Sequence, residues 1–384
     1  MDFNQEFCIT VTCASGVESV TKNELKKLGY SAPPALNGTL TFSSNALAVA
    51  RCNLFLRTAD RVYILLKTFS ATTFDQLFDG VSAIPFEDFL DKSAKITVVG
   101  KCVKSSLFAV SSCQSIIKKA IAVRLCKKFH VNSLAETGAE YEINFSIFKD
   151  QVTISLNTSG TGLHKRGYRD KVWIAPIKET LASAILYLSR FDYSAPFADV
   201  FCGSGTLGIE GARMALNHVS GKFRKFAFLD WNNFPKKAYQ TALEEGLDKE
   251  IKNKKLEFYC SDINHKAIEL AKYHAKRAGV GEQIKFTTAP VKDFYLSSAG
   301  GTIVTNPPYG IRIFDRKEAE QCYKDLGEVY SKLNGWNAFV ITEHKGFERY
   351  FGKKADKNRK LYNSNTECRL YQYINRIGER DGKR

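Results

Sequence analysis

An amide, two prolines and a tyrosine stand directly behind a stretch of sequence that is typical of a buried strand. Residues 303–305 end that stretch, and Asn306, Pro307, Pro308 and Tyr309 follow it. Proline locks φ and has no N–H, so this turn is rigid and its carbonyl groups have few local donors. The segment is either the stiff end of a strand or a surface that binds a flat polar group, because it offers a carboxamide and an aromatic ring.

Two glycines and a carboxylate are the next residues that could carry chemistry. Gly203 and Gly205 lie between a predicted strand and a predicted helix, where they permit a tight turn and a close approach of a ligand to backbone N–H groups. Asp262 ends the second β strand of the same pattern, and a carboxylate there can accept hydrogen bonds from both hydroxyls of a ribose. The alternative is that Asp262 caps the helix that begins near His265. Together the two strand ends favour a nucleoside site.

The spacing between these groups argues against a dinucleotide cofactor. In a dinucleotide-binding fingerprint the acid lies roughly 20 residues after the glycines, whereas here residues 222–246 intervene before Asp262. We interpret the intervening segment as an inserted strand and helix. The pattern weakens the case for NAD and leaves another nucleoside cofactor.

The elements that must position these residues alternate between strand and helix after about residue 175. The strand-like runs are "FADVF", "KLEFYCSD", "IKFTTA", "GTIVTN" and "NAFVIT", and helical runs lie between most of them. This rhythm predicts an α/β domain with a mostly parallel sheet covered on both faces. In such sheets ligands bind beyond the carboxyl ends of the strands, which is where the candidate residues lie.

The first half of the chain mixes short strands with two-faced helices and is predicted to form α+β units. One helix covers residues 112–130, and a hairpin after it turns at Lys149 and Asp150. The helix residues expected to face a core are Ile116, Ile117, Ala120, Val123 and Leu125. Because 384 residues exceed the size of one core, we divide the chain into two α+β units, a linker and an α/β domain. Their predicted boundaries are 1–68, 69–160, 161–175 and 176–384.

The charge balance favours a polyanionic partner. The chain has 56 Lys and Arg against 40 Asp and Glu, a net charge of +16, and cations that neutralise phosphates release bound counterions. The alternative is a basic enzyme without such a partner. Lys118 and Lys119 lie on a basic face of the helix at 112–130, which either contacts nucleic acid or is simply solvated.

Basic and aromatic residues also alternate in the linker. Lys165, Arg166, Tyr168 and Arg169 can pair with phosphates and stack on bases, so we predict that they contact RNA. A solvated linker is the alternative. The basic run at 353–360 has the same two interpretations.

The ten cysteines show neither CxxC spacing nor a histidine at ligand spacing. This pattern predicts a reduced protein without a structural metal, and we expect it to be cytoplasmic. The first residues have no basic and apolar leader pattern, and no run approaches the roughly 18 apolar residues of a membrane span. We expect neither export nor insertion into a membrane.

Several motifs in order resemble those of a known family. "DVFCGSGT" and "NPPYG" resemble class I S-adenosylmethionine-dependent methyltransferases that modify exocyclic nitrogens. The segments "FCITVTCASGVESVTKNELKKLGY", "LRTADRVYILL", "TFDQLFDGV", "GLHKRGYR", "IAPIKETLA" and "KKADKNRKLYN" resemble the THUMP-domain RNA guanine-N2 methyltransferases, whose close members act on large-subunit ribosomal RNA. The resemblance implies a ferredoxin-like unit, a THUMP domain and a C-terminal Rossmann-like methyltransferase domain.

The resemblance also implies a place for S-adenosyl-L-methionine. Asp262 would accept from the ribose hydroxyls, and Ile263 would pack on the adenine. Where the family usually has an acid for the adenine amino group, this chain has Pro290, so either Asp293 or the backbone of Val291 would take that contact. The residues expected at the methionine and ribose end are Asp199, Cys202, Gly203, Ser204 and Gly205, and Asn306 would lie against the cofactor as well.

The strand-end motif would then position the target amine. The side-chain oxygen of Asn306 and the carbonyl of Pro307 would accept from its N–H groups, and Tyr309 would stack on the flipped base. Transfer would be in line and without a covalent enzyme intermediate. We expect Cys202 to have a packing role rather than act as a nucleophile, because no general base lies beside it in the sequence.

The expected function is therefore methylation of guanine N2 in large-subunit (23S) ribosomal RNA. Transfer RNA guanine-N2, adenine-N6 and protein glutamine-N5 methylation are alternatives, because the motif itself selects only a planar amine. A non-catalytic RNA-binding protein or ribosome assembly factor is the alternative from another class.

Overall fold

The computed structural model describes residues 3, 5–33, 38–171, 176–298, 300–310, 315–364 and 366–375. The chain forms two compact units that do not follow one another simply along the sequence. Unit 1 contains Met1–Thr12, Leu25–Leu163 and Arg224–Glu244, and unit 2 contains Cys13–Glu24, His164–Phe223 and Glu245–Arg384. The boundaries predicted from the sequence, 1–68, 69–160, 161–175 and 176–384, divide the chain into contiguous segments, and they stay a prediction.

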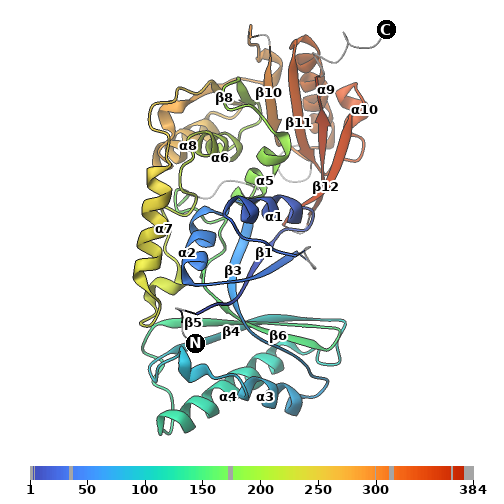
Figure 1. Ribbon diagram of the computed structural model, residues 1–384. Coiled ribbons are helices and arrows are strands. Elements are labelled where there is room, and N and C mark those ends of the chain that lie inside the picture. Colours follow the sequence, from blue (N-terminus) through green and yellow to red (C-terminus); the bar gives the residue numbers. More distant parts are fainter. Residues whose placement is uncertain are drawn as a thin grey trace, which may run out of the picture. The chain divides into compact units, whose positions relative to one another are not determined.

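Unit 1 is built on a six-stranded sheet with the order β2-β1-β3-β6-β5-β4 (Figure 1). Its strands are β1 (Phe7–Cys13), β2 (Thr39–Ser44), β3 (Ala59–Ser70), β4 (Lys95–Val103), β5 (Glu140–Phe148) and β6 (Gln151–Asn157). Its helices include α1 (Glu18–Lys27), whose first residues belong to unit 2, α2 (Ala46–Phe55), α3 (Phe74–Ser82), the 3-10 turn η1 (Phe86–Asp88) and α4 (Val110–Phe129). The hairpin between β5 and β6 turns at Lys149 and Asp150, both of which have positive φ, as predicted.

Helix α4 packs with α3 on one face of the β4–β6 half of this sheet (Figure 1). Its buried residues are Cys113, Ile117, Ala120, Ile121 and Leu125, which follow the helical period. Val123 was expected to face the core, but it is 50% exposed because it lies on the opposite side of the helix.

The segment at 222–246 corrects the sequence prediction of an inserted strand. Its first part forms a 3-10 turn, η2 (Ala227–Asp230), and its second part belongs to α7 (Lys236–Asp248). Trp231 is fully buried, stacks on Tyr141 with ring centroids 5.1 Å apart, and donates its indole N–H to the carbonyl of Glu140 at 3.2 Å. The aromatic residues therefore anchor this segment on the first residues of β5 instead of adding a strand.

Unit 2 is built on a seven-stranded sheet with the order β12-β13-β11-β10-β7-β8-β9. The strands are β7 (Phe197–Asp199), β8 (Phe258–Asp262), β9 (Ile284–Thr288), β10 (Gly301–Thr305), β11 (Trp336–Thr342), β12 (Lys357–Asn363) and β13 (Thr366–Tyr373). Strands β7 to β11 are parallel, and β13 is antiparallel to both of its neighbours. The helical elements are α5 (Glu179–Ser189), α6 (Thr206–Ala215), α8 (His265–Arg277), η3 (Gly281–Gln283), η4 (Val291–Asp293), α9 (Arg316–Lys332) and α10 (Phe347–Phe351).

Two hydrophobic cores cover the two faces of this sheet. Helices α5, α6 and α8 contribute to one core, and α9 and α10 contribute to the other (Figure 1). The prediction of a mostly parallel α/β sheet with helices on both faces is confirmed. The carboxyl ends of the parallel strands therefore meet at a single edge, which is where the candidate residues lie.

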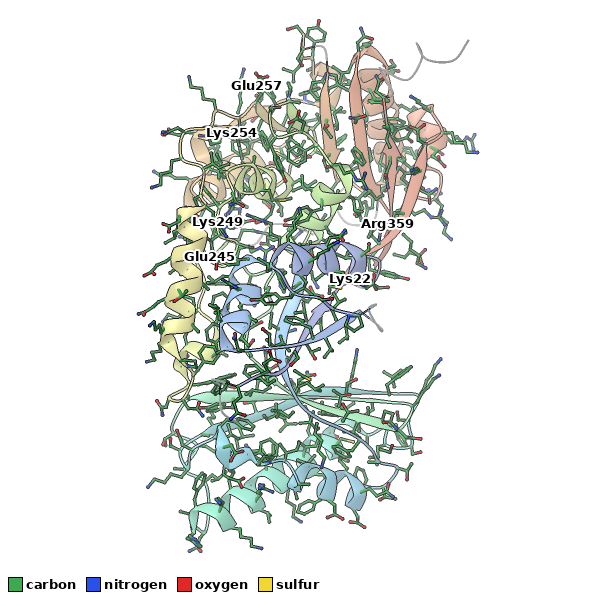
Figure 2. All side chains as sticks on the ribbon, in the orientation of Figure 1. Lys22, Glu245, Lys249, Lys254, Glu257 and Arg359 are labelled. Atoms are coloured by element: carbon green, nitrogen blue, oxygen red, sulfur yellow. The ribbon has the colours of Figure 1, made fainter. Side chains whose placement is uncertain are left out.

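The edge strand β12 is tied to the start of α1 within unit 2. Arg359, which is labelled in Figure 2, donates to the carbonyl of Gly16 from Nε at 3.0 Å and from Nη2 at 2.7 Å, and to Ser19 Oγ at 3.1 Å. Gly16 has φ +87°, and a Cβ there would lie 2.7 Å from the carbonyl oxygen of Lys360. Residues 13–24 are thus held closely against β12.

Among the helices of the described residues, none has the length and apolar character needed to span a membrane.

Candidate active site

The loop between β7 and α6 forms one wall of the site. Gly203 has φ +50° and Gly205 has φ +85°, and Gly205 is the N-cap residue of α6. A Cβ on Gly205 would lie 3.0 Å from the Cβ of Ala271, so glycine meets both a conformational and a packing requirement here. The free N–H groups of the first turn of α6 open towards the same edge of the sheet.

Asp262 fixes the shape of that loop and does not cap the next helix. Its Oδ2 accepts the N–H of Gly203 and its Oδ1 accepts the N–H of Asn264, both at 2.9 Å. Asn264 is the N-cap residue of α8 and accepts the N–H of Lys266 at 2.9 Å. The alternative interpretation of Asp262 as a helix cap is therefore wrong. Burial raises the pKa of Asp262, and its two backbone hydrogen bonds oppose that rise.

Asp199 is a buried carboxyl at the end of β7. Thr305 Oγ1 donates to its Oδ1 at 2.6 Å, and the N–H of Phe201 donates to the same atom at 3.4 Å. Burial raises the pKa of Asp199 to about 7, the hydrogen bonds lower it, and the charge of nearby Asp262 raises it further. The site thus contains a carboxyl group that titrates near neutral pH.

Replacing Asp199 with asparagine is expected to raise the melting temperature at pH 8 and to change it much less at pH 5. The folded carboxyl has a pKa of about 7 against the ordinary 3.8, so between these values the folded state holds a proton that the unfolded state releases. Protonation of Asp199 thus stabilises the folded state fully below pH 3.8, and this stabilisation is lost as the pH rises through about 7. Asparagine has no charge to bury at any pH, so the variant does not lose stability in this way. Thermal melts of both proteins at the two pH values would measure this, with the exposed Asp248 changed to asparagine as the matched control. An equal difference in melting temperature at pH 5 and pH 8 would contradict it.

A cavity of about 540 Å³ opens at the carboxyl ends of the strands of unit 2. Most of the residues predicted to bind a cofactor or the target line it. They are Asp199, Cys202, Gly203, Ser204, Asp262, Ile263, Val291, Asn306, Pro307 and Tyr309. Gly205, the N-cap residue of α6, does not line the cavity itself. Asp293 is exposed and does not line the cavity either. Of the two groups considered for an adenine contact, only Val291 lines the cavity, next to Pro290.

The cavity is acidic although the chain is strongly basic. Four acids line it, Asp199, Asp262, Asp325 and Glu343, and none of its described lining residues is Lys or Arg. Within the described part of the chain no three His, Cys, Asp or Glu residues are grouped as metal ligands. The charge of the cavity therefore suits an organic cation.

The strand-end motif is held in place by two tyrosines. The hydroxyl of Tyr309 donates to Asn306 Oδ1 at 2.7 Å, and the hydroxyl of Tyr323 donates to the carbonyl of Pro308 at 2.7 Å. No donor in the described residues bonds to the carbonyl of Pro307. Tyr309 is half-buried and packs against the core on the α5, α6 and α8 face. Its hydroxyl thus orients the amide of Asn306, a role that the sequence interpretation missed.

Cys202 is buried, and its thiol is unsuited to act as a nucleophile. Burial raises its pKa well above the ordinary value, and the neighbouring Cys260 and the charges of Asp199 and Asp262 raise it further. A high pKa keeps the thiol protonated. These properties favour the packing role that was expected.

Two of the four linker residues predicted to contact RNA are instead part of the core of unit 2. Arg166 is 2% exposed and Tyr168 is 1% exposed. The hydroxyl of Tyr168 donates to Glu210 Oε1 at 3.0 Å, and Arg166 Nε lies 3.6 Å from Glu210 Oε2. Side chains this deeply buried cannot pair with phosphates or stack on bases, so the RNA-contact prediction for these two residues is wrong.

The remaining basic candidates lie at or near the surface. Lys165 is exposed, and Arg169 is half-buried and bonds to Glu179 Oε1 at 3.0 Å. On α4, Lys118 pairs with Glu136 at 2.9 Å and Lys119 is exposed. Contact of Lys165, Arg169, Lys118 and Lys119 with RNA stays a prediction.

An exposed aromatic and basic surface lies at the turn end of the β5–β6 hairpin in unit 1. We call it the hairpin-end patch, and it consists of the exposed residues Lys101, Val103, Lys104, Phe108, Phe148 and Lys149 on β4, the loop after it and the hairpin turn. The turn is bound to the loop after β4, because the N–H of Lys149 donates to the carbonyl of Val103 at 3.3 Å and the N–H of Ser106 donates to Asp150 Oδ1 at 2.7 Å. Phe108 is 81% exposed. An exposed cluster of this kind in a folded unit is typical of an interaction surface.

The remaining residues that line the cavity could not be found from local patterns. Cys322 and Asp325 come from α9, Glu343 follows β11, and the turn between β12 and β13 contributes Asn363, Ser364 and Thr366. The order of the sheet brings them together, and no short motif marks them in the sequence.

The sheet order and the cavity at its carboxyl edge are those of a class I methyltransferase domain. Residues 166–372 match the family described as "RMKL-like, methyltransferase domain". Residues 9–63 match the "RlmL ferredoxin-like domain", and residues 71–157 match the THUMP domain. The chain belongs to this family of RMKL-like methyltransferases, with ferredoxin-like and THUMP domains N-terminal to the methyltransferase domain.

Two curated relatives illustrate the family. The chain is 41% identical over 375 residues to the "Putative RNA methyltransferase YpsC" of Bacillus subtilis, covering 97% of each protein. It is 32% identical to the "Ribosomal RNA large subunit methyltransferase K/L" of Syntrophotalea carbinolica, covering 94% of this chain and 53% of that protein. The chain thus spans about half the length of the K/L relative.

Two solved structures are similar along nearly the whole chain. One is described as "SMU.472, a putative methyltransferase complexed with SAH", with a TM-score of 0.92, 37% identity and coverage of 96% of this chain and 98% of that one. The other, from Listeria monocytogenes, is described as "a predicted N6-adenine-specific DNA methylase", with a TM-score of 0.91, 42% identity and coverage of 96% of both chains.

Proposed function

We propose that this protein transfers a methyl group from S-adenosyl-L-methionine to the exocyclic N2 of a guanine in large-subunit ribosomal RNA. The observation that carries the proposal is a single acidic cavity that joins Asp199 and Asp262 to the amide oxygen of Asn306. The first two residues suit a cationic nucleoside cofactor, and the third suits a planar amine.

The cavity fits S-adenosyl-L-methionine by charge and by donor set. The cofactor carries a sulfonium and an ammonium group, and the cavity has four acids and, among its described residues, no lysine or arginine. Asp262 would accept the ribose hydroxyls beside Ile263, and the N–H groups at the start of α6 would face the carboxylate end. The solved structure described as a complex with SAH supports this assignment.

Positioning of the target nitrogen would supply most of the rate acceleration. The lone pair of an exocyclic amine is delocalised into the purine ring, so the amine is a poor nucleophile unless it is held. Asn306 Oδ1 and the carbonyl of Pro307 would accept its two N–H groups and aim the nitrogen at the methyl carbon. The N–C bond would form as the C–S bond breaks, the sulfur would keep the electron pair, and the nitrogen would then lose a proton to solvent. Tyr309 would hold Asn306 Oδ1 in place through its hydroxyl.

The choice of RNA is supported by the relatives and the THUMP domain, whereas the choice of guanine rests on the resemblance of the sequence motifs to guanine-N2 methyltransferases. The K/L relative is described as acting on large-subunit ribosomal RNA, and the THUMP domain suits an RNA partner. Adenine N6 is the second candidate, because the Listeria neighbour is described as an adenine-specific DNA methylase and both bases present planar amines.

Mass spectrometry of nucleosides would test the proposal. Ribosomal RNA and DNA from a strain without this gene would each be incubated with the protein and S-adenosyl-L-methionine, and then digested. We expect N2-methylguanosine to appear, and tandem fragments would give its position. Appearance of N6-methyladenosine without N2-methylguanosine would overturn the choice of base, and methylation of DNA alone would overturn the choice of RNA.

Replacing Phe108 with alanine is expected to weaken binding of ribosomal RNA fragments by roughly 5- to 150-fold, because each aromatic–base stack contributes about 1 to 3 kcal/mol. Lys104 is exposed in the same patch; replacing it with alanine should lower the slope of log affinity against log salt by about one. Filter binding over a range of salt concentrations would measure both effects. The matched control is Ile251→Ala, which removes an exposed apolar side chain from unit 2. Unchanged affinity in the Phe108 variant would mean that RNA does not use the hairpin-end patch.

A further inference from the structure

Strand β10 separates the cavity into two ends. In the order β13-β11-β10-β7-β8, Asp199 and Asp262 end β7 and β8 on one side of β10, whereas Glu343 follows β11 on the other side. The first end is the one assigned above to the cofactor. The β11 end is therefore the place for the rest of the target base.

Glu343 lies at the same level as the strand-end motif. Strands β10 and β11 are parallel, and Thr305 is the register partner of Val340. Glu343 is three residues beyond Val340, as Pro308 is three residues beyond Thr305. The hydroxyl of Tyr323 links the two strand ends, because it donates to the carbonyl of Pro308 at 2.7 Å and lies 3.2 Å from Thr342 Oγ1.

Within the described part of the chain, no hydrogen bond or ion pair joins the carboxylate of Glu343 to another residue. It is half-buried and lines the cavity. Its charge also acts on the neighbouring motif: burial is the main cause that raises the pKa of Tyr309, and the charge of Glu343 adds to it. By contrast, Asp199 and Asp262 are both held by hydrogen bonds from within the protein. An acid of this kind beside a binding cavity is suited to accept a hydrogen bond from a ligand.

We propose that Glu343 selects guanine by accepting the N1–H of the target base while Asn306 and Pro307 hold its N2 amine. This inference rests on the proposed function and names the residue that chooses the base. Guanine presents an N–H at N1 directly beside the N2 amine. Adenine presents a bare acceptor nitrogen at N1, which a carboxylate repels. Glu343 thus adds the base discrimination that the strand-end motif lacks.

The base analogue 2-aminopurine tests this contact directly. It keeps an amine at position 2, but its N1 has no hydrogen. Two synthetic RNAs that copy the methylated site and differ only in guanine or 2-aminopurine at that position would be compared by kcat/KM. For the unaltered protein we expect a preference for guanine on the order of 10- to 100-fold, which corresponds to the discrimination that a good base contact provides.

Glu343→Gln is expected to reduce that preference to within about threefold, because a carboxamide can donate to a bare N1 as well as accept from an N1–H. Glu343→Asp should restore part of the preference. The ratio between the two RNAs is compared across variants, so any intrinsic difference in reactivity of the two amines cancels. Glu328→Gln, an exposed acid on α9, is the matched control and should keep the full preference.

The possible failures are distinguishable. If the unaltered protein forms no N2-methylguanosine, the proposed function fails and this inference falls with it. If N2-methylguanosine forms but the Glu343→Gln variant keeps the full preference for guanine, only this inference is overturned. Loss of S-adenosylhomocysteine binding in that variant, measured by calorimetry, would instead assign Glu343 to the cofactor and also overturn it.

Discussion

Replacing Asn306 with alanine is expected to slow methyl transfer by about 100- to 1,000-fold, the range observed when one preorganised hydrogen-bonding group of an active site is removed. The side-chain oxygen of Asn306 lines the cavity and is oriented by the hydroxyl of Tyr309 at 2.7 Å. Without it, one N–H of the target amine has no acceptor and the nitrogen is free to turn away from the methyl group. Affinity for S-adenosylhomocysteine should stay almost unchanged, because Asp199 and Asp262 are intact.

Single-turnover kinetics and calorimetry would separate these two effects. Tyr309→Phe removes only the hydroxyl that orients the amide, so it should lower the rate by less than the alanine variant does. Asn232→Ala, which removes an amide in unit 1 that bonds to Asp91 at 3.1 Å, is the matched control and should leave the rate unchanged. Undiminished transfer by the Asn306 variant would show that the amine is held by other groups.

Glu210→Gln is expected to lower the free energy of unfolding of unit 2 by about 3 to 5 kcal/mol, because removing one partner of a buried ion pair leaves an uncompensated charge. Glu210 is fully buried on α6 between two buried arginines, with Arg166 Nε and Arg213 Nη1 each 3.6 Å from its carboxylate. Ser183 Oγ and the hydroxyl of Tyr168 also donate to it, at 2.9 and 3.0 Å. Glutamine keeps the size of the side chain but removes the negative charge that lies beside both guanidinium groups.

Differential scanning calorimetry would measure the loss. The transition of unit 2 is identified as the one that S-adenosylhomocysteine shifts upwards, because the ligand stabilises the unit that binds it. The exposed Glu328→Gln serves as the reference for a carboxylate lost at the surface. A loss no larger than that of the reference would mean that the buried cluster contributes little net stability.

The cofactor end of the cavity could be predicted from the sequence because each of its residues belongs to a short local pattern. Gly203, Asp262 and Asn306 all follow strand-like runs, and parallel strands bring such positions to a common edge. The opposite end could not be predicted. Glu343 and Asn363 reach the cavity only because β11 and the β12–β13 pair are placed beside β10 by the sheet order, which no local spacing encodes.

Two of the wrong predictions have related physical causes. In the linker, interleaved basic and aromatic residues resemble an RNA-binding segment. Arg166 and Tyr168 instead contact the carboxylate of Glu210, which is more than 40 residues away on α6. In the segment at 222–246, an aromatic run has the alternation of a strand, yet Trp231 fixes it on the sheet of unit 1 as a 3-10 turn. In both cases a tertiary partner far along the chain overrides the local pattern.

The exchange of segments between the two units limits how this architecture can be rearranged in evolution or in the laboratory. Residues 13–24 belong to unit 2, and Arg359 of β12 holds them through Gly16 and Ser19. Unit 1 in turn takes Arg224–Glu244 from within the sequence of the methyltransferase half. A recombination in the linker at 161–175 would give a catalytic module whose β12 has lost its covering segment and an RNA-binding module without its Trp231 anchor. New combinations of these two modules must therefore carry at least one further exchange, which favours inheritance of the pair as a single gene.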